Sequence, residues 1–415
     1  MTGRRGPAVA LVALTVVAWV IAEQWDLTPH RHLTDLPLYE DAARAIAGGD
    51  VPYRDVPFEY PPLAAGLVTF ARLLPISYAA AFSLLMLAAL CATVLGIVAT
   101  ARALGLSARR QALTGVVVAL TPFVLGDFVA TRFDLAVAAL LAWTLWAAVT
   151  DRFALAWGLL AAAVALKLVP VVLVPLLVVW HRRRRGTGPA LASGGLAALA
   201  VAATFLPFVA LSPGGVWDMF RYHIDRPLQI ESLGSAYLLG LHALAGIELR
   251  VETTFGSQNL IGGGPQVIAA VSTALVFVAV AAICATFVIL LRRIAQPGGA
   301  HLFVTACAAT LGVTVAGGKV LSPQYLVWLL PAALLVTGRY GRGAFAVMVC
   351  ALVATQLYFP VRYWELVGLE TPPIALLVIR DALLVALAAL AWPRSHPAPL
   401  PAPPPVPARP SVAQR

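Results

Sequence analysis

The sequence predicts an all-α polytopic membrane protein, and two observations carry this prediction. First, the 415 residues are 60% hydrophobic and only 12% charged, whereas soluble domains keep about 25% of their residues charged. Second, apolar stretches recur along the whole chain, and stretches of about 20 apolar residues are typical of membrane helices. A net charge of +10 would suggest nucleic acid for a soluble protein. Here the positions of the charges indicate membrane topology instead, so we expect a lipid bilayer and no nucleic acid as partner.

The apolar stretches predict about twelve membrane helices. The residue range 153–180 is one long apolar block that ends in the run HRRRR at 181–185. A single helix here would place these arginines outside the cell, against the positive-inside rule. A break at 167–170 makes a short, hairpin-like pair of helices and returns the arginines to the cytoplasm. The other predicted spans are about 7–25, 76–100, 111–126, 134–150, 189–211, 266–291, 300–316, 325–338, 343–358 and 374–392.

This topology predicts a cell-membrane protein with both termini in the cytoplasm. Of the 19 acidic residues, all but Asp151 and Asp381 fall in or beside loops on the opposite face. Aspartate and glutamate are weak topology signals, so this skew indicates function on the extracytoplasmic face. We therefore expect one membrane domain over 1–392, followed by a Pro-rich cytoplasmic tail at 393–415 that is disordered.

Two long extracytoplasmic loops are predicted, over 26–75 and 212–265. The first contains two candidate juxtamembrane helices. One starts near Pro37, which suits a first helical turn, and stops at Gly48 and Gly49. The other covers the apolar range 61–74, which is too short to span a bilayer. Asp35 precedes the first helix, where a carboxylate caps the helix, serves in chemistry, or does both.

The sequence shows no metal-type spacing of cysteine or histidine. The four cysteines all fall inside apolar segments, as expected of small core side chains. They are Cys91, Cys284, Cys307 and Cys350. We therefore expect neither a metal site nor a cofactor.

Cations, carboxylates and aromatic residues are predicted to converge on the acid-rich face. Lys319 and Arg226 suit a phosphate anchored on a lipid, and a nearby carboxylate could accept the proton of an attacking hydroxyl. Alternatives stay open for two of the cations. Arg132 lies between Asp127 and Asp134 in the sequence and forms either a structural salt bridge or part of the site, and Lys167 either snorkels to the interface or binds a ligand.

Seven short motifs occur in a fixed order along the chain. They are D-x-x-x-Y at Asp35 and Tyr39, G-x-x-x-Y at Gly49 and Tyr53, YPPL at 60–63, FDLAVA at 133–138, KLVP at 167–170, RPLQIES at 226–232 and SPQYLVWLLP at 322–331. In these motifs the chain resembles the GT-C superfamily of membrane glycosyltransferases, and most closely glycosyltransferase family 87, which comprises polyprenol-phosphate-mannose-dependent α-mannosyltransferase-like proteins.

The resemblance implies an inverting transfer of a mannosyl-like residue from a polyprenyl-phosphate sugar to a glycolipid or glycan acceptor, without a metal. It implies Asp35 as general base. Some relatives use a histidine in a late loop, where this chain has Lys319, so His223 is kept as a substitute or helper. The expected substrate-binding residues are Tyr39, Tyr53, Tyr60, Lys167, Arg226, Glu231, Lys319 and Gln324.

Two rival functions fit the same composition. A transporter or flippase of lipid-linked glycans would place ionisable residues near the bilayer midplane and show repeat symmetry. In this chain the charges sit at the edges of the spans, except at Lys167, Arg380 and Asp381, and no repeat stands out. A binding or scaffold protein of the same fold without activity is the third reading.

Overall fold

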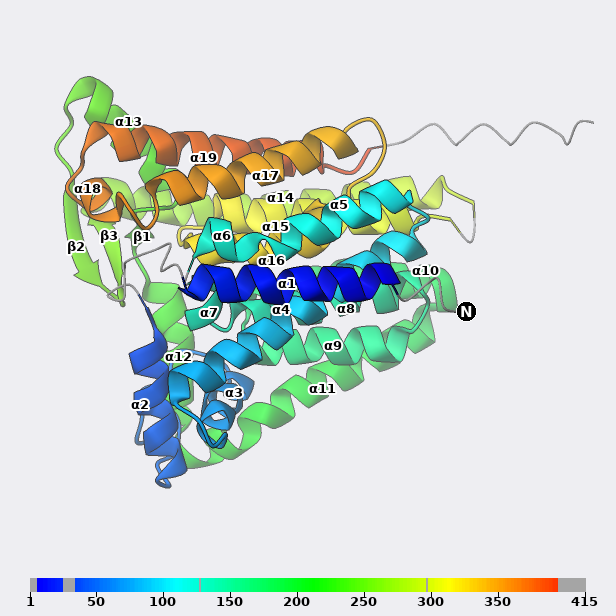
Figure 1. Cartoon of the computed structure of the whole chain (residues 1–415), viewed down its shortest axis with the longest axis horizontal. Coiled ribbons are helices and arrows are strands. Elements are labelled where there is room, and N and C mark those ends of the chain that lie inside the picture. The colour runs from blue at the N-terminus through cyan, green and yellow to red at the C-terminus, as the bar shows by residue number, and fades with distance from the viewer. Residues whose placement is uncertain (1–5, 25–33, 127, 296–297, 395–415) are drawn as a thin grey trace, which may run out of the picture.

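The computed structural model describes residues 6–24, 34–126, 128–295 and 298–394, and the predicted tail at 393–415 lies almost wholly outside this range. The described chain is a bundle of helices that run side by side (Figure 1), which confirms the all-α polytopic prediction. Seven described helices are long and apolar enough to cross a membrane: α1 (Gly6–Gln24), α4 (Tyr78–Ala103), α11 (Thr187–Leu211), α14 (Gly263–Arg292), α15 (Ala300–Gly317), α17 (Gly341–Tyr358) and α19 (Thr371–Leu390).

The remaining predicted spans correspond to shorter helices. Pro122 interrupts the predicted span over 111–126, because proline lacks the N–H of a continuing helix, and two helices form there. The predicted span over 325–338 is likewise short. These helices are α5 (Ala108–Ala119), α6 (Thr121–Leu125), α8 (Asp134–Val149), α9 (Phe153–Leu166), α10 (Val174–Arg185) and α16 (Leu326–Ala333).

The predicted break between α9 and α10 is confirmed. Lys167 leaves the helical conformation, and a 3₁₀ turn, η2 (Val169–Leu173), leads into α10. The end of α10 then returns to the start of α9. There Arg184 Nε donates to Asp151 Oδ1 at 2.7 Å.

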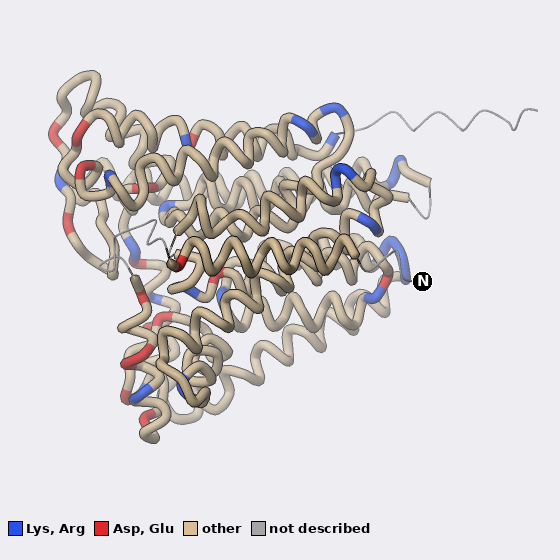
Figure 2. The backbone as a smooth tube through the Cα atoms, viewed as in Figure 1, with Lys and Arg blue, Asp and Glu red and all other residues tan. Residues whose placement is uncertain are grey.

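The two ends of the bundle differ in charge. Figure 2 shows the acidic residues gathered at one end, here called the acidic end, whereas lysine and arginine dominate the opposite, basic end. The first described helix, α1, begins at the basic end (Figure 1). This separation along the helix axes follows the pattern expected from the positive-inside rule.

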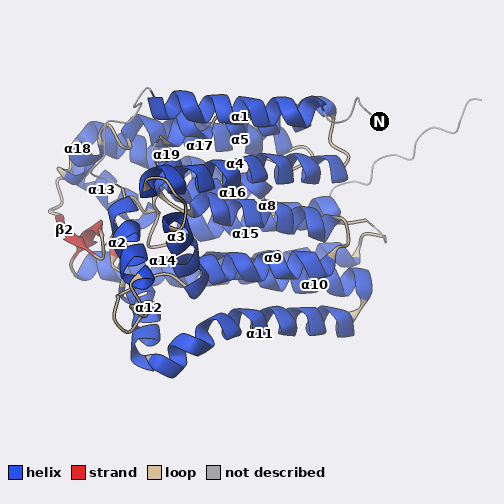
Figure 3. Cartoon of the chain, turned by 60° about the horizontal axis from the view of Figure 1, so that its bottom comes forward, coloured by secondary structure: helices blue, strands red, loops and turns tan. Residues whose placement is uncertain are grey.

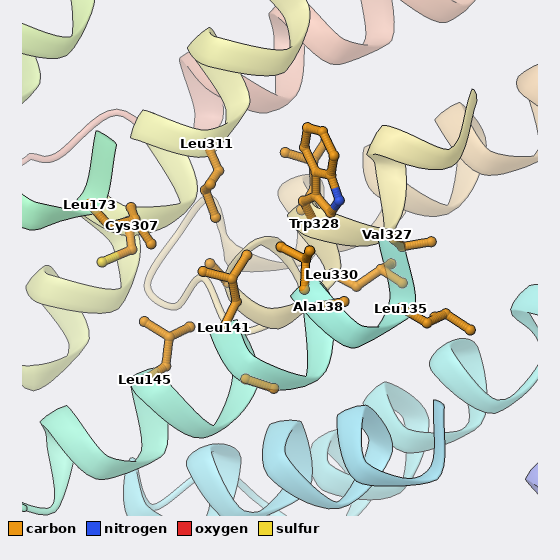
Figure 4. Close-up of a cluster of buried hydrophobic side chains, with 14 of the residues drawn as sticks. Leu135, Ala138, Leu141, Leu145, Leu173, Cys307, Leu311, Val327, Trp328 and Leu330 are labelled. Atoms are coloured by element: carbon orange, nitrogen blue, oxygen red, sulfur yellow. The ribbon is translucent and has the colours of Figure 1, made fainter. Parts of the chain in front are cut away.

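Helix α8 forms the centre of the core. Its residues Leu135, Ala138, Leu141 and Leu145 recur every three or four positions and therefore share one face. Each is at most 1% exposed. They pack toward side chains of α15 and α16, including Leu311 (Figure 4). Lipid tails are as apolar as these side chains, so the contacts stabilise the bundle through close packing rather than through removal from water.

Short elements cover the acidic end. In the first loop, α2 (Leu36–Ala47) and α3 (Pro62–Arg72) match the two predicted juxtamembrane helices. The second loop contains α12 (Pro213–Asp225) and α13 (Leu233–Ala245). Helices α2 and α12 lie across the axes of the long helices (Figures 1 and 3), as expected of helices on a membrane surface. The other short elements are α7 (Phe128–Thr131), η3 (Pro323–Tyr325) and α18 (Tyr363–Val367).

The second loop also contains a small antiparallel sheet that was not predicted. Its strands are β1 (Leu228–Gln229), β2 (Arg250–Thr254) and β3 (Ser257–Ile261), in the order β1-β3-β2. Strand β1 pairs Leu228 with Leu260 of β3, and both side chains are at most 1% exposed. The sheet therefore fixes the RPLQIES segment, which the sequence marked as part of the site.

Helix α12 docks closely on the first loop at Gly215. A Cβ atom at this position would lie 1.8 Å from the carbonyl oxygen of Tyr53. Ser212 Oγ donates to the same carbonyl at 3.2 Å. The Tyr53 hydroxyl in turn donates to the carbonyl of Tyr60 at 2.7 Å. Only glycine permits this approach, so Gly215 sets the position of the side chains that α12 carries toward the site.

Candidate active site

A cavity of about 250 Å³ lies at the acidic end. Its walls come from both long loops, from α7 and the segment before α8, from Lys167 after α9, from the segment before α16 and from the region around α18. Seven of the ten residues predicted for the site line it, namely Asp35, Tyr60, Lys167, His223, Arg226, Glu231 and Gln324. No group of three or more His, Cys, Asp or Glu side chains suited to a metal ion occurs among the described residues.

Asp35 pairs with Arg132 across the cavity wall. Arg132 Nε lies 2.9 Å from Asp35 Oδ2, and Nη2 donates to Oδ1 at 3.0 Å. The Asp35 side chain makes no cap bond to α2; Thr34 Oγ1 accepts the Leu36 N–H instead, at 3.1 Å. The helix-cap interpretation of Asp35 was therefore wrong. An ionised carboxylate offers about four acceptor positions, so this side chain, 29% exposed, can still accept a proton from a ligand.

Lys167 is held inside the wall by Asp134. Its Nζ lies 2.7 Å from Asp134 Oδ1, and the two side chains are 12% and 3% exposed. Four aromatic rings surround the ammonium group, with the Trp328 centroid nearest at 4.9 Å. Lys167 therefore does not snorkel to solvent. Asp134 was considered as the partner of Arg132 but pairs with Lys167, and Asp127 lies outside the described residues.

His223 presents one nitrogen to the backbone of the first loop. Its Nε2 lies 2.8 Å from the carbonyl oxygen of Glu59. A carbonyl can only accept, so Nε2 carries the hydrogen and Nδ1 of the neutral ring is unprotonated. Burial lowers the pKa of His223 below its ordinary value, which favours this neutral form at pH 7. Glu59 also lines the cavity, although the sequence assigned it no role.

Arg226 is a cavity-lining cation that lacks an acidic partner within the described chain. Its Nη2 donates to Ser257 Oγ at 3.1 Å, and its guanidinium lies 5.7 Å from the ring centroid of Tyr222. No described carboxylate forms an ion pair with it, and its buried Nε has no hydrogen-bond acceptor. Arg132 and Lys167 each form an ion pair with a carboxylate, whereas Arg226 forms none in the described chain. The carboxylate that acts on its charge is Glu59 of the same cavity.

Lys319 lies close to the cavity but does not line it. Its Nζ donates to the carbonyl of Ile224 at 2.5 Å, near the end of α12. Burial, and next the neighbouring charge of Arg226, lower the pKa of Lys319. Lys319 therefore lies outside the cavity lining, and its positive charge acts on the cavity through its proximity to Arg226.

Glu231 is held in the wall by a buried polar network. Its carboxylate accepts from the Tyr358 hydroxyl at 3.0 Å and from Gln229 Nε2 at 3.2 Å. Its backbone carbonyl accepts from Arg380 Nη2 at 2.7 Å, and Arg380 pairs with Asp381 at 2.7 Å. Burial raises the pKa of Glu231 to about 7. The two ionisable residues inside α19 thus anchor the cavity wall.

Two of the predicted tyrosines lie behind the cavity rather than in it. Tyr39 is 1% exposed and packs against the rings of Phe82 and Phe133. Tyr53 supports the docking of α12 through its carbonyl. Gln324 does line the cavity, and its buried side-chain oxygen has no hydrogen-bond donor among the described residues.

The partners of the cavity charges could not be read from the sequence. Asp35 and Arg132 are 97 positions apart, and Arg132 has two acids close to it in the chain. Glu59 is different, because it directly precedes the YPPL motif, and that adjacency is a usable signal for a cavity carboxylate.

The family model of glycosyltransferase family 87 matches residues 58–323. The chain belongs to this family. The matched range contains Glu59, Arg132, Lys167, Arg226 and Glu231 but begins after Asp35.

The whole fold is also similar to a solved structure. The crystal structure of ArnT from Cupriavidus metallidurans bound to undecaprenyl phosphate matches 94% of this chain and 77% of its own, with a TM-score of 0.50 and 16% identity. This likeness shows a shared GT-C-type membrane fold. Among curated proteins, none matches the chain.

Proposed function

We propose that this family 87 glycosyltransferase moves a glycosyl residue, by resemblance a mannosyl residue, from a polyprenyl phosphate to a glycolipid or glycan acceptor. The observation that carries the proposal is Arg226, a cavity-lining cation without a carboxylate partner in the described chain. A guanidinium that forms no ion pair at a membrane end suits a lipid-anchored phosphate, which it can bind through two parallel hydrogen bonds. Lys319 strengthens the same positive field.

An apolar groove beside the cavity supports a lipid-linked donor. A second space of about 450 Å³ lies between α9 and α11, and its lining residues include Ala165 and Leu63. Ala165 precedes the cavity residue Lys167 by two positions, and Leu63 follows Tyr60 by three. A polyprenyl phosphate could place its phosphate in the charged cavity and its isoprenoid chain against the apolar side chains of the groove. The related fold of ArnT was solved with undecaprenyl phosphate, which is a ligand of this chemical class.

The proposed chemistry is one inverting displacement. The acceptor oxygen forms a bond to the anomeric carbon while the bond from that carbon to the phosphate oxygen breaks. The acceptor proton passes to the carboxylate of Asp35, which Arg132 holds in place. The departing polyprenyl phosphate gains negative charge, and Arg226 stabilises it. The neutral His223, with Nδ1 unprotonated, is a supporting acceptor for the acceptor sugar's hydroxyls.

The proposed extracytoplasmic location of the site rests on charge. The positive-inside rule favours a cytoplasmic location for the arginine-rich end of the bundle, and the cavity lies at the opposite end. The transporter alternative receives less support. Arg380 and Asp381 form an ion pair, and Arg380 also donates to the backbone carbonyl of Glu231. These intramembrane charges therefore have a structural role and do not require a transport pathway.

The test is transfer by the purified protein in liposomes. Labelled polyprenyl-phosphate mannose and a membrane glycolipid extract are supplied, and products are identified by mass spectrometry. We expect a labelled glycolipid one hexose heavier than its acceptor. Movement of intact labelled lipid between leaflets, without any hexose transfer, would overturn the enzyme proposal in favour of a flippase. Glycolipid profiles of a deletion strain and its parent identify the acceptor.

A further inference from the structure

A second charged pocket lies far from the cavity, at the basic end between α10 and α14. It measures about 290 Å³. Three of its six lining residues are arginines, Arg182, Arg183 and Arg292, and none is acidic. Arg182 and Arg183 lie in the last turn of α10, and Arg292 is the last residue of α14. The pocket therefore sits where two helices reach the edge of the bilayer.

Two of these arginines leave the pocket with positive charge that the described protein does not neutralise. Arg182 and Arg292 make no ion pair with any described residue and are exposed. Arg183 donates to the carbonyl of Ile294 at 2.5 Å, which fixes the direction of its side chain. Arg184, in the same run, is paired with Asp151 and does not line the pocket. The pocket thus combines guanidinium groups with access from outside.

The remaining walls of the pocket are apolar. Val179, Val288 and Leu291 supply them, about one helical turn or less from the arginines. A free phosphate or sulfate ion would leave these side chains uncovered. A molecule with an anionic head and a hydrocarbon body would contact both surfaces, and basic pockets between membrane helices bind lipid headgroups in this way.

We propose that this pocket binds the phosphate headgroup of an anionic phospholipid, with the acyl chains lying along α10 and α14. The guanidinium groups suit a phosphodiester because each offers a planar pair of donors. The positive-inside rule explains why arginines lie at this end, but it does not require three of them to surround one apolar pocket. The proposal is independent of the glycosyl transfer at the opposite end.

Native mass spectrometry of the full-length protein in detergent tests the proposal. The probes are phosphatidylglycerol, and phosphatidylcholine as the neutral comparison. We compare the wild type with the double variant Arg182→Gln/Arg292→Gln. The control is Arg102→Gln/Arg109→Gln, which removes the same charge from exposed arginines outside the pocket.

We expect the wild type to retain phosphatidylglycerol in preference to phosphatidylcholine. The pocket variant should bind phosphatidylglycerol roughly tenfold or more weakly, whereas the control stays within about twofold of the wild type. Equal losses in the two variants would show general surface attraction and overturn the pocket assignment. Displacement of the bound lipid by inorganic phosphate alone would overturn the choice of a lipid, because phosphate cannot use the apolar walls.

Discussion

The carboxylate of Asp35 and the guanidinium of Arg132 face each other through two contacts of 2.9 and 3.0 Å. This pair links the segment before α2 to the segment before α8. Such a two-point geometry fixes the direction of a carboxylate as well as its charge. Asp35 therefore stands in a defined orientation at the cavity surface, whereas Arg226 stands there without an acidic partner in the described chain.

Replacing Arg226 should weaken donor binding. Arg226→Gln removes the cavity cation that forms no ion pair, and we expect the KM for the polyprenyl-phosphate sugar to rise about 10- to 100-fold, because charge-assisted hydrogen bonds contribute roughly 1.5–3 kcal/mol. Arg221→Gln, in the preceding helix α12, is the matched control, since its side chain is 58% exposed and does not line the cavity. Steady-state kinetics measure the KM for the donor in each variant. A KM that rises equally in both variants would refute the role of Arg226 in donor binding.

Breaking the Lys167–Asp134 pair should destabilise the protein. Lys167→Met leaves a buried carboxylate without its partner, and the expected cost is about 3–5 kcal/mol. The double variant Lys167→Met/Asp134→Asn removes both charges and should recover part of that loss. The measurement is the thermal unfolding temperature in detergent. A double variant no more stable than Lys167→Met would show that the pair is not coupled.

The docking of α12 predicts a contrast between two adjacent glycines. Gly215→Ala places a methyl group on the Tyr53 carbonyl oxygen and should cost about 3 kcal/mol, at the upper end of overpacking penalties, because backbone cannot move aside as a side chain does. Gly214→Ala is the control, since a Cβ atom added there would meet nothing within 4 Å. The yield of folded protein, measured by size-exclusion chromatography, should be lower for Gly215→Ala than for Gly214→Ala. Similar yields would contradict the close approach of α12 to the first loop.

The raised pKa of Glu231 predicts a pH dependence of stability. A carboxyl whose pKa is higher in the folded than in the unfolded protein stabilises the fold below its unfolded pKa of about 4.3. That contribution disappears as the pH rises through the folded pKa of about 7. Glu231→Gln cannot ionise, so it should lose less stability than the wild type between pH 5 and 8, by up to ~3 kcal/mol.

Thermal unfolding at both pH values measures this difference. Asp218→Asn, whose parent side chain is 71% exposed, controls for the removal of one acid. If the wild type and Glu231→Gln lose stability in parallel, the protonation state of Glu231 does not contribute.

Sequence patterns predicted the features that depend on local order and on the bilayer. The break at Lys167, the two surface helices after α1 and the grouping of seven site residues all follow from hydropathy, charge and motif order. The pairings did not follow, because a carboxylate and an arginine 97 positions apart meet only when the bundle closes. Tyr39 was predicted to bind substrate but packs in the core. An aromatic residue on a helix face packs inward or lines a cavity according to neighbours that are distant in the sequence.

The most direct test of the proposed mechanism is the rate of sugar transfer by Asp35→Asn. Asparagine keeps the size of the side chain but cannot take up the acceptor proton. We expect the rate from labelled polyprenyl-phosphate mannose to fall about 10²- to 10⁴-fold, while the amount of folded protein and the KM for the donor change little. A well-folded Asp35→Asn protein that transfers at the wild-type rate would contradict Asp35 as the base.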